Sequence, residues 1–503
     1  MTNPCDLTAT EARRLIGERR LSPVELLESC IERTEALNPA VNAIVTKAYD
    51  RARTEAKAAE AAVMRGAPLG LLHGLPAVIK DLNDTKGIRT TYGSRLYQDH
   101  LPQSDDPVVA RMRAHGAVIF GKTNTPEFGV GSNTVNRVFG PTGNPFDTTR
   151  TCGGSSGGSA VALATSMAPV ANGSDSGSSI RNPAAFCGVT GIRPTPGLVA
   201  SDRRVIGLST NGVQGPMGRT VADNALLLGA MAAFDPRDML SRPVDPSLFA
   251  ALKRVDVSGL RVAVSEDLGF APVDPIVRAL FRRKLGVFSS SFALCEDCDA
   301  GMGHAEMAYR GMRGLYFLAG FKKLYDEHRG ELDPNLAWNM EDALNSSAAD
   351  LAAALAEQTR IHRNFQALFD RYDVLLTPAV NVLPFPHRLP FPRTLEGRPA
   401  RHYAEWYSLS YGISLVGHPA ISIPAGLDPQ GTPFGLQVVG SRFGDLQLLE
   451  VALALEAMLA TFPETRRPVP DIMALSRAPA LVPATATESS ERRTHGYHPP
   501  DGH

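Results

Sequence analysis

Residues 152–171 read CGGSSGGSAVALATSMAPVA, and the order of the parts in this stretch indicates an α/β fold. A loop of glycine and serine leads into an apolar helix over residues 158–167. A short apolar run, Ala168–Ala171, follows and has the length of a buried strand. Short buried strands that alternate with helices are typical of a central sheet covered by helices.

The same alternation continues on both sides of this stretch. The runs Leu75–Ile79 and Ala117–Phe120 are predicted strands, with a predicted helix over 107–115 between them. Nearer the C-terminus the pattern returns. The predicted strands there are Leu260–Val264, Val374–Leu376, Ala420–Ile423 and Phe434–Val439, and the predicted helices are 273–286, 348–370 and 445–460.

The first 66 residues have a helical pattern instead. Thr8 and Ser22 each precede a glutamate by three positions, which is the spacing of a capping box at the start of a helix. Residues 46–65 are rich in alanine, glutamate, lysine and arginine, and predict a third helix with a solvated face.

Composition excludes several classes of protein. The chain has 503 residues, 43% of them hydrophobic and 20% charged, with a formal net charge of -1. This ordinary globular balance gives no reason to expect binding to nucleic acid or to an anionic membrane. No apolar run is long enough for a transmembrane helix, and the first residues are not predicted to be a signal peptide. The six scattered cysteines predict reduced thiols and a cytoplasmic protein.

Two glycine–serine segments carry the chemistry, Cys152–Ser159 and Gly173–Pro183. Glycine lets a ligand approach the backbone, and successive N–H groups in such a loop converge on a developing oxyanion. A flexible linker has a similar composition. However, a linker would not be bracketed by an apolar helix and by the sequence Ile-Arg-Asn-Pro over 180–183.

A serine nucleophile needs a base, and Lys80 directly follows the apolar run Leu75–Ile79. Burial disfavours the charged form of lysine, and a base near neutral pH requires a fall in pKa from about 10.4 to about 7–8. That shift corresponds to roughly 4 kcal/mol. A lysine after an apolar run is more often a surface residue. The glycine–serine segments favour the buried alternative.

Other motifs are weaker. Gly153–Gly157 fits the Gly-x-Ser-x-Gly elbow of α/β-hydrolases, but that elbow follows a strand, and Pro145–Thr151 is predicted to be a loop. Cys295 and Cys298 supply only half of a zinc site. His73 is interpreted as a structural hydrogen-bonding residue.

Taken together, these segments resemble the amidase signature family. The resemblance is strong over about 70–225 and 370–460. The matching segments are His73–Asp81, Gly121–Phe128, Cys152–Ser159, Gly173–Pro183, Gly215–Thr220, His418–Ala425 and Pro433–Gly440.

The resemblance implies one large α/β domain with a mixed, twisted central β-sheet covered by helices on both faces. That domain is expected over 1–475, followed by a flexible tail over 476–503. Its expected parts are an N-terminal helical segment (1–66), a signature core (67–225), a more variable region (226–370) and a C-terminal part of sheet and helix (371–475).

The resemblance also implies a catalytic triad. Lys80 matches the family's base, Ser155 its bridging serine and Ser179 its nucleophile, and the Gly154–Ser155 peptide bond is expected to be cis. The reaction needs no metal and no cofactor.

Further residues match family positions around this triad. Asp175 and Arg181 match residues that support the serine loop, and they are expected to form a buried charge pair. The chain departs from the family at Ser178, where glycine is usual. The expected oxyanion and substrate-binding positions are Gly129, Ser176, Gly177, Ser178 and Ser179.

The function implied is hydrolysis of a small aliphatic amide, aryl amide or carbamate-like substrate through a seryl acyl-enzyme. The alternative is the glutaminase (A) subunit of a tRNA-dependent amidotransferase, whose usual serine- and aspartate-containing stretch is replaced by Ser201–Gly207. The expected partner is a small-molecule amide, without nucleic acid or membrane. The oligomeric state stays open, with a homodimer as one candidate.

Overall fold

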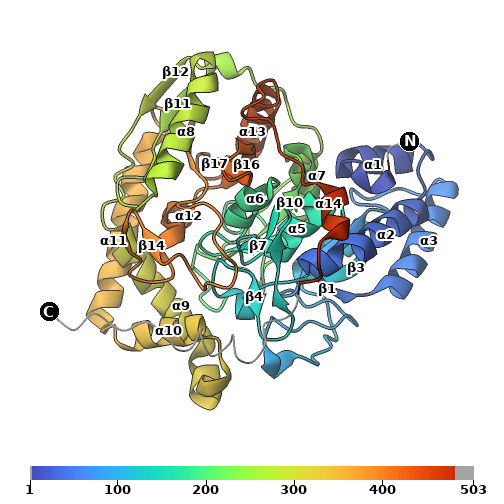
Figure 1. The fold of residues 1–503 in the computed structure, drawn as a ribbon, viewed down its shortest axis with the longest axis horizontal. Coiled ribbons are helices and arrows are strands. Elements are labelled where there is room, and N and C mark those ends of the chain that lie inside the picture. Colours follow the sequence, from blue (N-terminus) through green and yellow to red (C-terminus); the bar gives the residue numbers. More distant parts are fainter. Residues whose placement is uncertain (1–2, 482–503) are drawn as a thin grey trace.

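A computed structural model describes residues 3–481, and within them eleven strands form one large sheet (Figure 1). In order across the sheet, the strands are β1 (Ile44–Lys47), β3 (Val118–Thr123), β2 (Pro76–Lys80), β8 (Val170–Asp175), β10 (Val213–Gly218), β9 (Thr190–Arg193), β16 (Ala420–Leu427), β17 (Pro433–Val439), β13 (Val374–Pro378), β11 (Arg261–Val264) and β12 (Leu294–Asp297).

The sheet is mixed. Strand β2 pairs in parallel with both β3 and β8, and β11 pairs in parallel with β12 and β13. The remaining pairs are antiparallel. Because β2, β3 and β8 are parallel, their carboxyl ends lie at one edge, where binding sites of α/β folds commonly form.

Helices flank this sheet, as predicted, and Figure 1 shows α1 to α3 and α9 to α11 at opposite ends of the molecule. The helices are α1 (Ala9–Gly17), α2 (Pro23–Val41), α3 (Tyr49–Met64), α4 (Pro107–Ala114), α5 (Gly157–Ala164), α6 (Arg181–Cys187), α7 (Val221–Met231), α8 (Pro275–Phe288), α9 (Ala305–His328), α10 (Pro334–Leu344), α11 (Ala348–Leu368), α12 (Ser408–Val416), α13 (Asp445–Leu459) and α14 (Ile472–Arg477). Short two-stranded ribbons pair β4 (Val135–Asn136) with β5 (Gly140–Pro141), β6 (Gly143–Asn144) with β7 (Asp147–Thr151), and β14 (Thr394–Leu395) with β15 (Arg398–Pro399).

Of the two predicted capping boxes, the cap formed by the threonine or serine side chain is present in each. The Thr8 side chain accepts a hydrogen bond from the Glu11 N–H, and the Ser22 side chain accepts from the N–H groups of Val24 and Glu25. The third predicted helix begins at Tyr49 rather than at residue 46, because Ile44–Lys47 pairs with β3 as an edge strand.

Two other interpretations are wrong in detail. The predicted loop at 145–151 contains β7, although β7 pairs with β6 and not with the main sheet. Strand β8 extends to Asp175, beyond the apolar run from which it was predicted. Its last four residues are polar or glycine because they serve the site described below.

The C-terminal boundary expected at 475 falls inside α14, which packs against α2. Leu475 is buried, and the Leu481 N–H donates to the Pro39 carbonyl. Of the predicted tail, residues 482–503 lie outside the described residues. Between residues 3 and 481, none of the helices has the length and apolar character needed to cross a bilayer.

Candidate active site

The site begins with Lys80, the last residue of β2, whose side chain is fully buried. Its Nζ lies 2.6 Å from Oγ of Ser155, 2.8 Å from Oγ of Ser156 and 3.0 Å from Oγ of Ser174. Its backbone N–H donates to the Asn172 side chain at 2.8 Å, which fixes the end of the strand. The amine is therefore surrounded by hydroxyl groups.

Burial lowers the pKa of Lys80 to about 7, and the negative charge of Asp175 opposes this shift in part. Desolvation dominates because no carboxylate forms an ion pair with the amine among the described residues. A substantial fraction of Lys80 is therefore uncharged at neutral pH and able to accept a proton.

Ser155 lies in the loop before α5 and is almost completely buried. The Gly154–Ser155 peptide bond is cis, as expected. Gly153 has a φ of +77°, and a side chain there would come within 2.9 Å of Asn182 and Pro183. The glycines of this loop thus let it pass close to the start of α6.

Ser179 lies in the loop between β8 and α6, and this loop is joined to the first one by the backbone. The Ser156 N–H donates to the Ser179 carbonyl at 3.0 Å. The side chains of Ser155 and Ser179 line the same cavity. The Ser179 hydroxyl makes no hydrogen bond within the described chain, so its oxygen is available to a substrate.

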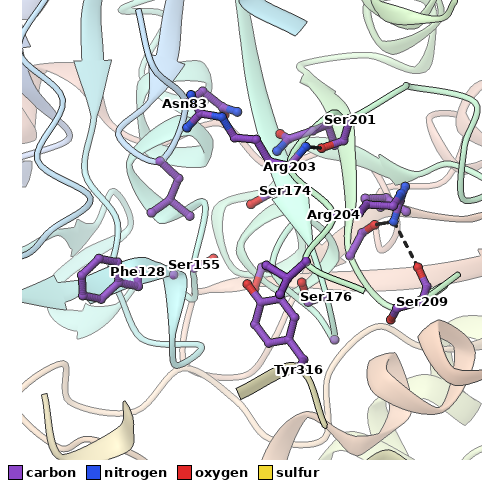
Figure 2. A pocket seen from close by; sticks show the side chains of 18 of the residues that line it. Asn83, Phe128, Ser155, Ser174, Ser176, Ser201, Arg203, Arg204, Ser209 and Tyr316 are labelled. Carbon is purple, nitrogen blue, oxygen red and sulfur yellow. Dashed lines mark hydrogen bonds between the residues drawn. The ribbon is translucent and has the colours of Figure 1, made fainter. Parts of the chain in front are cut away.

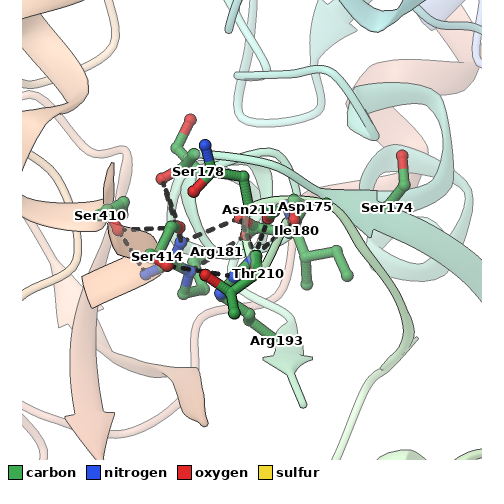
Figure 3. A network of polar contacts seen from close by, with 12 residues as sticks. Ser174, Asp175, Ser178, Ile180, Arg181, Arg193, Thr210, Asn211, Ser410 and Ser414 are labelled. Atoms are coloured by element: carbon green, nitrogen blue, oxygen red, sulfur yellow. Dashed lines mark hydrogen bonds and ion pairs between the residues drawn. The ribbon is translucent and has the colours of Figure 1, made fainter. Parts of the chain in front are cut away.

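A buried ionic network holds the Ser179 loop (Figure 3). Arg181 binds both carboxylate oxygens of Asp175, at 2.9 and 3.0 Å, and donates to the Gly177 carbonyl at 3.0 Å. Arg193 donates to the Asp175 carbonyl at 2.5 Å. All three charged side chains are fully buried. The predicted charge pair is therefore present, with Arg193 as a member that the motif did not indicate.

Ser178, the departure from the family pattern, has a defined partner. Its hydroxyl lies 2.6 Å from that of Ser132, and both residues are buried. The added side chain thus ties the Ser179 loop to the loop after β3. Gly129 lies on that second loop, and a side chain at Gly129 would meet Leu82 at 2.7 Å and Ser155 Oγ at 3.4 Å.

These residues line one cavity of about 300 Å³ (Figure 2). The predicted site residues brought together there are Gly129, Ser155, Ser176, Gly177, Ser178 and Ser179. Aromatic rings form part of the wall. They belong to Tyr92, Phe128, Tyr309, Tyr316, Phe321 and Tyr407.

Sequence reasoning missed some members of the site. Ser156 and Ser174 lie in the quoted glycine–serine segments, so a search for every hydroxyl in those segments would have found them. Tyr309 and Arg313 come from α9, which has no recognisable motif.

The weaker motifs have structural roles or none here. All six cysteines are free, and Cys295 lies on the edge strand β12. The His73 ring is hydrogen-bonded to the Ala59 carbonyl at 3.0 Å, as interpreted from the sequence. Within residues 3–481, no three side chains of His, Cys, Asp or Glu are grouped so that they could hold a metal ion.

Comparisons with known proteins agree with this geometry. The family model described as Amidase matches residues 25–449. The chain is 36% identical over 460 residues to an acylamidase of Rhodococcus erythropolis, covering 90% of this chain and 95% of that protein. It is also 36% identical over 476 residues to the A subunit of the glutamyl-tRNA(Gln) amidotransferase of Moorella thermoacetica, covering 90% and 96%. Among solved structures, a bacterial aryl acylamidase of the amidase signature family superposes with a TM-score of 0.84 at 30% identity, covering 95% of this chain and 99% of that one.

Proposed function

The chain belongs to the amidase family and is an amide hydrolase, and from this we propose that Lys80, Ser155 and Ser179 are its catalytic residues. The observation that carries the proposal is the buried Lys80 amine, 2.6 Å from the Ser155 hydroxyl and with a pKa lowered to about 7. A neutral amine in that position is a general base at physiological pH.

In the first half of the reaction, Lys80 accepts the proton of Ser155 while Ser155 accepts the proton of Ser179. The Ser179 oxygen attacks the amide carbonyl and forms a tetrahedral intermediate. Its collapse breaks the carbon–nitrogen bond. The relay returns a proton to the leaving amine, and an acyl-enzyme remains. Water then attacks the ester, loses its proton to the same relay and releases the acid.

The oxyanion of the intermediate is bound by the backbone N–H groups of the loop over 176–179. One such donor is typically worth about 3–4 kcal/mol of transition-state stabilisation. Asp175 and Arg181 hold this loop in place through the network that they form. Their role is orientation, because their charged groups are occupied by each other.

We propose an aryl amide as the substrate class, in preference to a small aliphatic amide or a carbamate. The aromatic wall of the cavity supports this, because offset and edge-to-face ring contacts favour an aryl group. A small-molecule substrate and a cytoplasmic location complete the proposal. It includes no nucleic-acid partner and leaves a homodimer as one candidate for the oligomeric state.

The alternative function, a glutaminase subunit of an amidotransferase, is kept because such proteins are among the relatives. Residues 201–207 bear on the choice between the hydrolase and the glutaminase. They replace the serine- and aspartate-containing stretch that is usual in the glutaminase, and Ser201, Arg203 and Arg204 among them line the cavity. Release of ammonia from glutamine that rises when a partner protein is added would favour the alternative over the lone hydrolase.

The central test is Ser179→Ala assayed on an anilide. We expect loss of acyl-enzyme formation and a fall in kcat of at least about 10³-fold, because the nucleophile is removed. Ser290→Ala, at an exposed serine outside the cavity, is the matched control and keeps its turnover. Thermal unfolding of both variants verifies the fold. Retained anilide hydrolysis in a folded Ser179→Ala protein would contradict the proposed triad.

A further inference from the structure

Three arginine side chains line the cavity, and two of them are neutralised by carboxylates. Arg203 contacts Asp106 at 2.7 Å, and Arg204 contacts Asp238 at 2.9 Å (Figure 2 shows both arginines). Arg313, from α9, differs from them. Within the described part of the chain, its contacts include no carboxylate.

The contacts of Arg313 are to neutral groups. Its Nε donates to the Asn339 side chain at 2.7 Å, and its two terminal nitrogens donate to Tyr309 at 3.2 Å and to Tyr403 at 2.5 Å. Its guanidinium also lies 5.0 Å from the centre of the Phe317 ring. These contacts fix the plane of the guanidinium without cancelling its charge.

Two of the five N–H donors of Arg313 remain unused by these bonds. The side chain is only partly buried, and it lines the cavity. The spare donors are one N–H on each terminal nitrogen, and the side chain that carries them lines the cavity.

No acidic side chain of the cavity wall pairs with the Arg313 guanidinium among the described residues. Asp106 is paired with Arg203, and Asp202, the other aspartate of the wall, is paired with Arg237 at 2.9 Å. Among the three arginines of the wall, Arg313 alone has no carboxylate contact within the described residues. A guanidinium with two free donors in a fixed plane is suited to bidentate binding of a carboxylate.

This charge lies close to the reacting groups. Tyr309, which accepts from Arg313, covers Gly177 of the oxyanion loop so closely that a side chain on Gly177 would come within 2.5 Å of the tyrosine hydroxyl. One side chain therefore separates Arg313 from the loop that binds the oxyanion.

We propose that the natural substrate is an amide that carries a carboxylate several bonds from the scissile carbonyl, and that Arg313 binds this carboxylate. The proposal rests on the proposed function, because it places the amide at Ser179. It makes Arg313 a specificity-determining residue. The competing explanation is a scaffold role, in which Arg313 only holds Tyr309 and Tyr403 in place.

The experiment compares pairs of substrates that differ only in charge. In one pair the carboxylate is on the acyl side of the amide: glutaric acid monoanilide is compared with the analogue in which a carboxamide replaces that carboxylate. The other pair has it on the amine side, 4-(butyrylamino)benzoate against the corresponding benzamide. We expect the carboxylate to be preferred in kcat/KM by about 10-fold to 100-fold in one of the two pairs, mainly through KM, as for a hydrogen bond to a charged group.

Arg313→Met is expected to reduce that preference to about onefold, and Arg313→Lys to keep part of it. The matched control is Arg310→Met, at an exposed arginine one turn away on α9 that pairs with Asp342 and does not line the cavity. It is expected to keep the full preference. The readout is the ratio within a pair, so an equal loss on both members would show the scaffold role and overturn the proposal.

Absence of a carboxylate preference in both pairs for the unaltered enzyme would also overturn it. If Arg313→Met does not fold, inhibition of the unaltered enzyme by glutarate against glutaramide decides: stronger inhibition by the dianion supports the proposal, and equal inhibition contradicts it. The Ser179→Ala assay separates the two levels. Retained hydrolysis by Ser179→Ala would contradict the proposed triad. A missing charge preference would contradict only the proposed role of Arg313.

Discussion

Lys80 shows how a single side chain acquires its chemistry from its neighbours. Three hydroxyl groups satisfy its amine, so it is buried without a carboxylate partner. A carboxylate at the same distance would stabilise the ammonium form and raise the pKa, and the amine would then be no base at neutral pH. The choice of serine at 155, 156 and 174 therefore favours the neutral amine.

The pH dependence of the unaltered enzyme follows from this environment. We expect kcat/KM for a neutral anilide to rise tenfold per pH unit below about pH 7 and to level off above it, because the base must lose its proton and its pKa is about 7. Initial rates between pH 5 and 9 measure this profile. A flat profile in pre-steady-state acylation over that range would contradict a lysine base.

At this scale, sequence motifs predicted the proposed triad and the loop residues beside it, but not Arg313. Lys80, Ser155 and Ser179 stand in segments where glycine and small residues are needed for backbone contact, and such segments are recognisable in one sequence. Arg313 lies on α9, a helix without a recognisable motif. Its significance comes from the absence of a carboxylate nearby, which only the folded structure reveals.

Among the elements, the parallel trio β3–β2–β8 is what assembles the site. The carboxyl ends of these strands present Thr123, Lys80 and Asp175 at one edge of the sheet. The loops that follow β3 and β8 carry Gly129 and Ser179. The apolar runs predicted β2 to within one residue and the start of β3, since buried parallel strands are continuously apolar, but β3 continues three residues beyond its run, to Thr123. The end of β8 could not be predicted, because Asn172 and Ser174 serve the site and break the apolar pattern.

Asp175 is the last residue of β8, and its charge acts on Lys80 at the end of β2. The variant Asp175→Asn tests this interaction. Its charge raises the pKa of Lys80, so removal should move the midpoint of the pH–rate profile to lower pH. The variant should also lose about 3–5 kcal/mol of unfolding free energy, because Arg181 and Arg193 stay buried without their counter-ion. Rate profiles and denaturant unfolding measure both effects.

The control for this variant is Asp238→Asn. Asp238 is also buried and pairs with an arginine, Arg204. Unlike Asp175, it does not shift the pKa of Lys80. Its midpoint should match that of the unaltered enzyme. An unmoved midpoint in a folded Asp175→Asn protein would show that Asp175 has no electrostatic influence on the base.

At the scale of the whole molecule, two parts of the chain that are far apart in the sequence line the cavity. The signature core supplies the reacting loops, and α9 from the more variable region supplies Tyr309, Arg313 and Tyr316 opposite them. Figure 1 shows α9 and its neighbours α10 and α11 grouped at one end of the molecule. The family resemblance implied the mixed sheet and its helices, whereas the shape of this wall could not be predicted, because side chains that meet only in the fold leave no local pattern.

Burial of Lys80 lowers the free energy of unfolding by an amount that depends on pH and can be measured. Unfolded Lys80 has a pKa near 10.4, whereas the folded value is about 7. Between these values the unfolded chain holds one more proton, so the stability of the unaltered protein rises with pH relative to Lys80→Met. Below about pH 7 the folded protein must hold a buried ammonium, and its disadvantage is greatest there.

We therefore expect the difference in unfolding free energy, unaltered protein minus Lys80→Met, to increase by about 4 kcal/mol between pH 7 and pH 10 and to be constant below pH 7. Denaturant unfolding at each pH measures it. Ser155→Ala keeps the amine and should show the same rise as the unaltered protein, which separates the titration of Lys80 from the loss of a hydrogen bond. Parallel stability curves for the unaltered protein and Lys80→Met would mean that the amine titrates as it does in water, and the base would then have to be sought elsewhere in the cavity.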